Sequence, residues 1–289
     1  MKQGKWALLA LFAGALGIAF APIFVRWSEV GPVATAFWRM ALALPLLALW
    51  ASLQPRRAEA PARHTGIAMA LLAGLFFAAD LAVWHWSIRL TSVANATFLA
   101  NLAPVAVTLG AWVLLKERAK PVFFVGMALA MTGAALLVQA NVGGTGDALL
   151  GDALGILTAF FYAGYQLCVK RLRGAQPTAR IMLVSGAACA AVLLPLALAS
   201  GETVLPTTAT GWLVVLALAV VCQFGGQSLI TYAVAHLPAS FASVSLLVQP
   251  VAAAALAWLL FGETLAALQW LGAAAVLAGI WLARRGTHA

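Results

Sequence analysis

Long runs of apolar residues divide this sequence from one end to the other. Each run has about 20 residues, the length that an α-helix needs to cross the hydrocarbon core of a bilayer, and short polar or charged stretches separate the runs. Hydrophobic residues make up 64% of the chain and charged residues only 9%, which excludes a soluble protein with a charged surface. The sequence therefore predicts an all-α membrane protein with ten transmembrane helices.

The predicted spans follow from the apolar runs and from the breakers between them. They lie near residues 6–26, 32–52, 66–88, 91–115, 121–140, 149–169, 179–199, 210–234, 239–261 and 266–283. The first run follows Lys2 and Lys5 and passes through Ala19-Phe20-Ala21, which resembles a signal-peptide cleavage site. Because the apolar run continues through Val25, we expect this segment to remain in the protein as a span.

Basic residues lie mainly in the connections on one side of the predicted membrane. With the N-terminus inside, fourteen Lys and Arg residues fall on the cytoplasmic side and only Arg26 and Arg89 fall outside. This asymmetry places both termini in the cytoplasm and predicts a multi-pass protein of the cell inner (plasma) membrane. The net charge of +9 has the same origin, so it does not indicate nucleic-acid binding.

The chain contains an internal repeat with an offset of 146 residues. In this register Pro104 meets Pro250, Trp112 meets Trp258 and Glu117 meets Glu263, and two glycine pairs also coincide, Gly126 with Gly272 and Gly133 with Gly279. The match has 12 identities in 43 positions without a gap. Alanine and leucine match often by chance in such a sequence, but proline, tryptophan, glutamate and two glycines in one register indicate a duplication.

The repeat predicts two five-helix halves, residues 1–140 and 147–286. Because five is odd, the second half enters the membrane from the opposite side, which makes an inverted-topology repeat. Two inverted halves can exchange roles around a central cavity between them, so that the cavity opens to one side of the membrane and then to the other. The sequence thus predicts transport by alternating access.

The repeated stretches resemble the drug/metabolite transporter superfamily, and within it the EamA-type ten-helix transporters. The resemblance is carried by Phe37-Trp38-Arg39 and by the stretch from Pro104 to Glu117, which recurs from Pro250 to Glu263. It implies an exporter or permease of amino acids or similar small metabolites and does not fix the solute. The second half departs from the pattern at Ser185, where an arginine matching Arg39 is absent.

Two charged residues lie inside predicted spans. Asp80 is expected past the midplane of the third span, and Arg39 at a comparable depth in the second. Charged groups in a membrane either face a cavity or are paired. Asp80 is therefore predicted to be a proton-coupling group, a counter-ion for a substrate amine, or the static partner of Arg39.

Amide and aromatic side chains inside the spans are the predicted lining of the substrate cavity. Asn101 and Gln249 precede the two repeat prolines, whose missing N–H groups leave carbonyls free near the midplane. Such amides can instead join helices to one another. The predicted lining consists of Trp38, Asp80, Trp84, Phe98, Asn101, Tyr162, Gln166, Gln223, Gln227 and Gln249. This lining suits a zwitterionic or neutral solute.

Other classes of protein lack support in the sequence. No H-E-x-x-H or G-x-S-x-G motif indicates an intramembrane enzyme, and no phosphate-binding loop indicates ATP-driven transport. Cys168, Cys189 and Cys222 have neither paired spacing nor His partners, so we expect no metal site, and we expect no cofactor. A drug or cation exporter of the same fold is the main alternative, and an intramembrane enzyme is a weaker one. A monomer, with a small solute and the bilayer as its partners, suffices for the mechanism.

Overall fold

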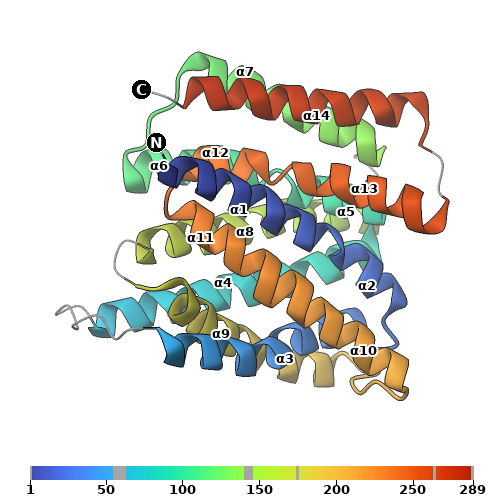
Figure 1. Ribbon diagram of the computed structural model, residues 1–289. Coiled ribbons are helices and arrows are strands. Elements are labelled where there is room, and N and C mark those ends of the chain that lie inside the picture. The colour runs from blue at the N-terminus through green and yellow to red at the C-terminus, as the bar shows by residue number, and fades with distance from the viewer. Residues whose placement is uncertain (1, 55–62, 140–145, 174–175, 263–264, 288–289) are drawn as a thin grey trace. The chain divides into compact units, whose positions relative to one another are not determined.

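The computed structural model describes residues 2–54, 63–139, 146–173, 176–262 and 265–287. These residues form helices and connections and contain no strand. Ten helical segments of this described part are long and apolar enough to cross a membrane, and the ends of each agree with the predicted span within four residues. The prediction of a ten-helix membrane protein is confirmed (Figure 1).

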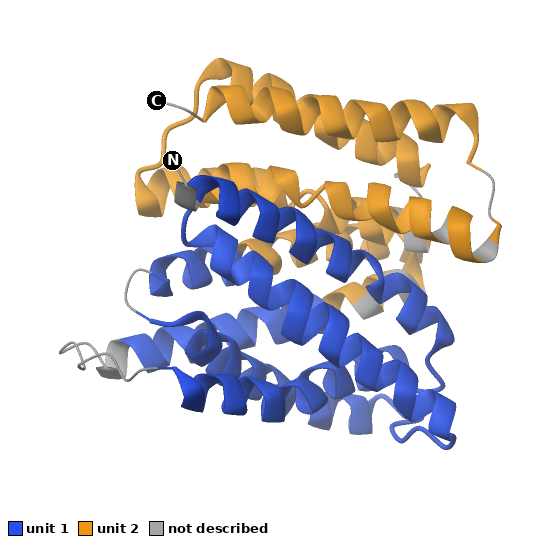
Figure 2. Ribbon diagram, in the orientation of Figure 1, with its two compact units in different colours: residues 1–82, 164–236 blue, residues 83–163, 237–289 orange. Residues whose placement is uncertain are grey.

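The chain divides into two compact units that cut across its two sequence halves (Figure 2). Unit 1 comprises residues 1–82 and 164–236, and unit 2 comprises residues 83–163 and 237–289. Each unit therefore takes helices from both halves, and two long helices, α4 (Arg63–Leu90) and α8 (Asp147–Leu172), each contribute one part to each unit.

Unit 1 is built from helices that are distant in sequence but packed side by side. Its other helices are α1 (Lys2–Ala19), α2 (Ala21–Trp27), α3 (Pro32–Leu53), α9 (Thr178–Ala199), α10 (Ala209–Ala217), the π-helical segment η1 (Leu218–Gln227) and α11 (Ser228–Val234). α3 packs along α9, and α1 packs along η1 and α11. Gly14 and Gly17 of α1 make the second contact possible, because a Cβ at either would lie within 3.2 Å of the Gly226 backbone.

Two glutamates outside the spans of unit 1 cap helices that begin far away in the sequence. Glu29, before α3, accepts hydrogen bonds from the backbone N–H groups of Thr207 and Thr208, where α10 begins, and from the Thr208 hydroxyl. Glu202, before α10, accepts from the N–H of Ala34 in the first turn of α3. The hydroxyl of Thr208, together with the backbone N–H groups of Thr208 and Thr207, holds the pKa of Glu29 below its ordinary value.

Unit 2 contains two membrane helices that are interrupted in the middle. Its further helices are α5 (Val93–Ala100), α6 (Ala103–Leu115), α7 (Pro121–Val138), α12 (Ala239–Ser245), α13 (Val248–Phe261) and α14 (Ala267–Gly286). The α-helical hydrogen-bond pattern is broken between α5 and α6 and again between α12 and α13, in each case just before a proline that cannot donate the next hydrogen bond.

The helices of the two sequence halves begin at the same spacing as the sequence repeat. α3 begins at Pro32 and α9 at Thr178, 146 positions later, and both have 22 residues. α5 and α12 begin at Val93 and Ala239, again 146 positions apart. Lys116 and Gly262, also 146 positions apart, both adopt the left-handed conformation that ends α6 and α13.

The contact between α7 and α14 pairs the repeated glycines crosswise. A Cβ at Gly126 would lie 2.6 Å from the Gly279 carbonyl oxygen, and one at Gly133 would lie 2.6 Å from that of Gly272. Since Gly126 matches Gly272 in the repeat and Gly133 matches Gly279, each glycine meets the counterpart of the other. This exchange requires antiparallel helices related by a pseudo-twofold axis.

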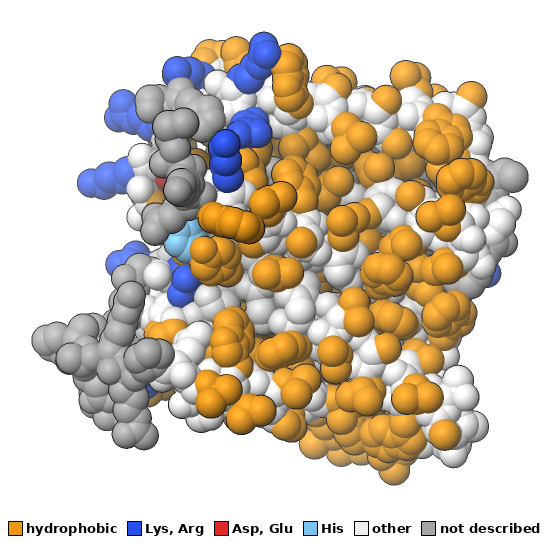
Figure 3. Space-filling model, viewed as in Figure 1, with side chains coloured by type: hydrophobic (Ala, Val, Ile, Leu, Met, Phe, Trp, Pro, Cys, Tyr) orange, Lys and Arg blue, Asp and Glu red, His pale blue; other side chains and the backbone are white. Residues whose placement is uncertain are grey.

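The outer surface of the chain is apolar over most of its area. Hydrophobic side chains dominate the face drawn in Figure 3. Large apolar side chains such as Trp112, Leu259 and Trp281 are exposed, as expected of helices that face lipid. In unit 2 the basic side chains collect where α14 ends beside the start of α7, since the N–H of Lys120 donates to the Gly286 carbonyl over 3.0 Å.

Candidate functional site

A buried polar cluster lies inside unit 1, between helices that the sequence separates by up to 184 positions. Arg39 of α3 donates from Nε to the Oε1 atom of Gln223 in η1 over 3.0 Å. Gln223 is 1% exposed, so its amide is available only to groups inside the unit. The guanidinium of Arg39 also lies 6.0 Å from the centre of the Phe77 ring on α4.

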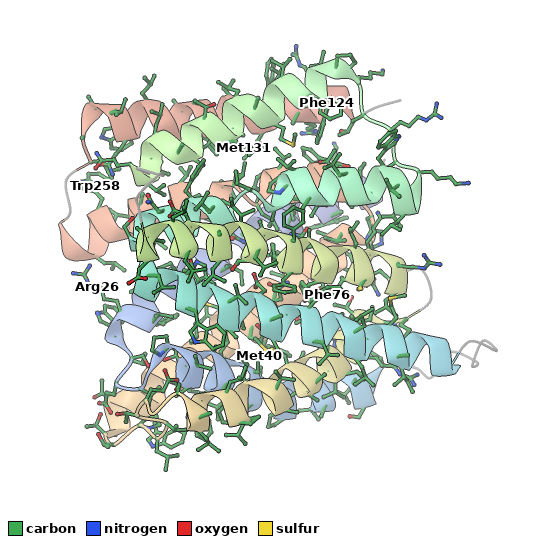
Figure 4. The ribbon with its side chains drawn as sticks, turned by 180° about the vertical axis from the view of Figure 1, so that it is seen from behind. Arg26, Met40, Phe76, Phe124, Met131 and Trp258 are labelled. Carbon is green, nitrogen blue, oxygen red and sulfur yellow. The ribbon has the colours of Figure 1, made fainter. Side chains whose placement is uncertain are left out.

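The cluster continues on the side of α8. The hydroxyl of Tyr165 accepts from Nε2 of Gln227 over 3.2 Å, and its ring stacks on Phe77 with ring centres 4.6 Å apart. Phe76, labelled in Figure 4, packs against Gly164 of α8, where a Cβ would lie 2.9 Å from the ring. These contacts fix α4, α8 and η1 around Arg39.

Asp80 lies on α4 one turn beyond Phe77 and is 9% exposed. Among the described residues, no hydrogen bond or ion pair joins Asp80 to Arg39, and the direct partner of Arg39 is Gln223. The three predicted roles of Asp80 stay predictions.

The helix that carries Gln223 and Gln227 has wider turns than an α-helix. Ten residues, Leu218–Gln227, are π-helical between the α-helical segments α10 and α11. Such runs are rare and are often found at functional sites. The Sγ atom of Cys222 donates to the Gly17 carbonyl of α1 over 3.1 Å, which helps to hold the segment. The matching residues of the first half, within α4, are α-helical.

Gln166 of α8 is a buried amide of this unit. It is 3% exposed, and neither its Nε2 nor its Oε1 atom has a hydrogen-bond partner among the described residues. The hydroxyl of Ser228, at the start of α11, is also buried and has no partner in the described part of the chain. A buried polar group that lacks a partner is costly.

The predicted cavity residues fall into two groups. Arg39, Gln223 and Gln227 belong to unit 1 and form hydrogen bonds of the polar cluster, and Asp80 and Gln166 belong to the same unit. Trp38 also belongs to unit 1, but its Nε1 donates to the Val204 carbonyl over 2.7 Å and its ring contacts Trp212, outside the cluster. The remaining predicted residues, all half-buried in unit 2, are Trp84, Phe98, Asn101, Tyr162 and Gln249, and the shared cavity stays a prediction.

In unit 2 the two interruption-site amides have different surroundings. Asn101 ends α5 immediately before the gap to α6. Gln249 lies at the start of α13, and its buried Nε2 atom has no hydrogen-bond partner in the part of the chain that the structure describes. Glu117 accepts from the N–H of Ala239 over 2.9 Å and thereby caps α12, whereas its repeat counterpart Glu263 lies outside the described residues.

Sequence reasoning passed over two residues that the structure places in polar contacts. Asp152 of α8 is 3% exposed in unit 2, and its Oδ1 accepts from the Thr91 hydroxyl over 2.8 Å. From the sequence, Asp152 is expected at the membrane interface, because it lies near the start of a predicted span. The sequence analysis names Tyr162 and not Tyr165. The two tyrosines are three positions apart on α8, so they lie on neighbouring parts of the same helix face, and this spacing is the one signal for Tyr165 in the sequence.

The unit 1 cluster brings charged and hydrogen-bonding side chains together inside membrane spans. Arg39 contributes a guanidinium, Gln223 and Gln227 contribute amides, and Tyr165 contributes a phenol. Among the described residues, no group of three His, Cys, Asp or Glu side chains is suited to a metal ion. Side chains of these types donate hydrogen bonds to polar groups and accept hydrogen bonds from them.

Comparison with known proteins places this arrangement in a family. Two consecutive matches to the EamA-like transporter family cover residues 5–139 and 149–285. This chain belongs to the EamA-like transporter family. Its two-repeat architecture is that of the family, and the family consists of transporters rather than enzymes.

Relatives of this EamA-like transporter carry names of transporters for small molecules. The chain is 30% identical to a riboflavin transporter of Rhizobium johnstonii over 93% of its length and 88% of that protein. It is 27% identical to the pseudopaline exporter CntI of Pseudomonas aeruginosa over 72% of each chain. An uncharacterised transporter of Archaeoglobus fulgidus is 25% identical over the full length of both chains.

The fold of this EamA-like transporter also occurs in a solved crystal structure. That structure matches with a TM-score of 0.74, covering 96% of this chain and 98% of the other, at 20% sequence identity. The likeness confirms the fold. The protein is thus a multi-pass membrane transporter of small molecules, as the sequence predicted.

Proposed function

We propose that this transporter exports an amino acid or a similar small metabolite across the cell inner membrane by alternating access. The observation that carries the proposal is that Asp80 and Gln166 of unit 1 are buried inside membrane spans and that neither side chain has a hydrogen-bond partner among the described residues. A structural role would satisfy such groups, because each unsatisfied one is costly in a membrane. A transported solute supplies the missing partners.

The proposed mechanism requires that residues 1–140 and 147–286 are inverted repeats. The equal spacing of helix starts and the crosswise glycine contact between α7 and α14 support this arrangement. Two inverted halves can each adopt the conformation of the other, which opens the binding site to opposite sides in turn. The uneven distribution of basic residues supports cytoplasmic termini.

Export of a drug or another organic cation is the second candidate. It is favoured by Asp80, a buried carboxylate that no described residue contacts directly. A cationic solute would be the direct partner that this carboxylate lacks. The two candidates differ in whether the solute also needs a negatively charged or polar end.

Transport into proteoliposomes tests the proposal. Purified protein is assayed for uptake of amino acids and organic cations, with and without a pH gradient, as wild type, as Asp80→Asn and as the control Asp147→Asn. Asp147 is exposed at the start of α8, so the same chemical change there leaves the cluster intact. We expect gradient-dependent uptake by wild type and control that Asp80→Asn loses. Uptake that ignores both gradient and mutation makes Asp80 structural, and no uptake of any solute contradicts the proposed function.

A further inference from the structure

Arg39 has hydrogen-bonding capacity that the protein does not use. A guanidinium carries five N–H donors, one on Nε and four on the two Nη atoms. Nε donates to Gln223, but no described oxygen accepts from Nη1 or Nη2. Neither Nη atom is buried in the way that the unpartnered amide atoms of Gln166 are. The edge of the guanidinium formed by Nη1 and Nη2 is therefore not fully buried and makes no hydrogen bond to the described residues.

Gln223 sets the orientation of that edge. Its amide is 1% exposed, and its backbone belongs to the π-helical segment that α1 contacts through Gly14 and Gly17. Because the guanidinium is planar, an oxygen bound at Nε leaves Nη1 and Nη2 as a free pair of parallel donors. This pair matches the two oxygens of a carboxylate, which Arg commonly binds in a bidentate manner.

A carboxyl group lies on the neighbouring helix but does not pair with the guanidinium. Asp80 follows Phe77 by one turn of α4, and the Phe77 ring, which stacks on Tyr165, lies 6.0 Å from the guanidinium. No hydrogen bond or ion pair links the described atoms of Asp80 and Arg39. A guanidinium and a carboxyl that lie on adjoining helices without pairing suit a solute with a carboxylate at one end and an amine at the other.

We propose that Arg39 binds a carboxylate of the transported solute through Nη1 and Nη2, and that Gln223 is the positioning residue that orients Arg39 for this contact. The inference rests on the proposed function and narrows its substrate class to solutes with a carboxylate. An amine on the same solute faces Asp80. Gln223 acts through Arg39 and does not itself need to touch the solute.

Matched pairs of ligands isolate the carboxylate contact. Each standard amino acid and its carboxamide differ only at the group that Arg39 is proposed to bind. Thermal stabilisation of the purified protein by increasing concentrations of each ligand gives an apparent affinity. For wild type we expect at least one amino acid to bind about tenfold or more tightly than its carboxamide, because charge-assisted bidentate hydrogen bonds are the stronger ones.

Four variants then assign the preference to residues. Arg39→Gln should abolish the preference for the carboxylate while leaving the affinity for the carboxamide within about twofold. Arg39→Lys keeps the positive charge but lacks the two parallel N–H donors of the guanidinium, so it should retain part of the preference. Gln223→Leu should reduce the preference without removing the charge of Arg39. Arg171→Gln removes a positive charge from an exposed position of α8 and should change nothing.

The outcomes separate this inference from the proposed function. A preference that survives in Arg39→Gln, or wild type that binds no amino acid more tightly than its carboxamide, overturns the role of Arg39 even if transport is observed. If Arg39→Gln does not fold, Arg39→Lys tests the role of Arg39, and a fully retained preference for the carboxylate in that variant overturns it. An unchanged preference in Gln223→Leu overturns the positioning role alone. Absence of uptake by wild type in proteoliposomes counts instead against the proposed function.

Discussion

Two glutamines of unit 1 show how one residue type can have opposite effects inside a membrane protein. Both side chains are 3% exposed. Gln227 donates to Tyr165 over 3.2 Å, whereas neither Nε2 nor Oε1 of Gln166 has a hydrogen-bond partner among the described residues. A satisfied buried amide stabilises the fold modestly, while an unsatisfied one costs its full desolvation. The sequence alone does not show which of the two amides has a hydrogen-bond partner.

Replacing Gln166 with leucine should therefore stabilise the protein. We expect Gln166→Leu to raise the free energy of unfolding by about 1–3 kcal/mol, because it removes an unpartnered buried amide of similar volume. The matched change Gln227→Leu should lower it by about 1 kcal/mol, since the hydroxyl of Tyr165 loses one of its hydrogen bonds. Unfolding in detergent micelles measures both values. A loss of stability in Gln166→Leu would show that its amide has a partner in the folded protein.

Glu29 should make the stability of unit 1 depend on pH. The pKa of Glu29 is lowered in the folded chain, chiefly by the Thr208 hydroxyl. The cap therefore stabilises the folded state above the ordinary carboxylate pKa of about 4.3 and is lost as the pH falls through the lowered value. We expect Glu29→Ala to be less stable than wild type at pH 7 and the difference to shrink towards pH 3. Thermal unfolding across this range measures it, and a difference independent of pH would contradict the cap.

At the scale of elements, close backbone contact holds α7 and α14 together. The seam depends on Gly126, Gly133, Gly272 and Gly279, each of which faces backbone atoms of the opposite helix within 2.7 Å of where a Cβ would lie. Helices pack this closely in membranes through small residues. In this seam, the glycines that match in the sequence repeat contact each other crosswise.

A larger side chain in this seam should separate the two helices. Gly126→Leu places a Cβ 2.3 Å from the N atom of Ala283, so we expect it to lower the free energy of unfolding by about 3 kcal/mol or more. Ala128→Leu adds similar bulk to an exposed position of the same helix and should be tolerated. Thermal unfolding and size-exclusion chromatography compare the two variants. Equal stability of both would mean that α7 and α14 do not pack in this way.

The π-helical segment should be essential for transport but not for folding. Deleting Val220, an exposed residue of η1, allows tighter turns and rotates Gln223 by about 100° relative to α10. Gln223 then no longer meets Arg39, and we expect uptake in proteoliposomes to fall at least about tenfold while the variant stays monodisperse. The substitution Val220→Ala, which keeps the length, is the control. Full transport by the deletion variant would show that the wide turns have no role.

At the scale of the whole molecule, the direction of insertion follows from charge rather than from packing. The positive-inside distribution predicts that the connection between α6 and α7 is cytoplasmic and that the one between α9 and α10 is outside. Thr203 and Arg118 are exposed in these two connections.

A membrane-impermeant maleimide applied to intact cells tests this orientation. In a background without native cysteines, Thr203→Cys should be labelled directly and Arg118→Cys only after permeabilisation. The native residues Cys168, Cys189 and Cys222 are buried, so replacing them with alanine should be tolerated. The reverse labelling pattern would place both termini outside.

The sequence by itself determined the number of spans, their ends and the family. Lipid accepts only helices whose backbone groups are satisfied internally, so an apolar run of sufficient length leaves little choice of structure. The repeat was also visible, because proline and glycine act on the local backbone, and the same residues later proved to interrupt or join the helices.

The tertiary structure alone decided which polar residues meet. Arg39 and Gln223 are 184 positions apart, and no periodicity in the sequence shows that the second and eighth spans are neighbours in unit 1. The contact between η1 and α1, which includes the hydrogen bond from Cys222 to Gly17, likewise joins segments more than 200 positions apart. Spans follow from the solvent that surrounds each helix, whereas the partner of a buried polar group follows from packing between distant segments, and that packing is a property of the folded chain.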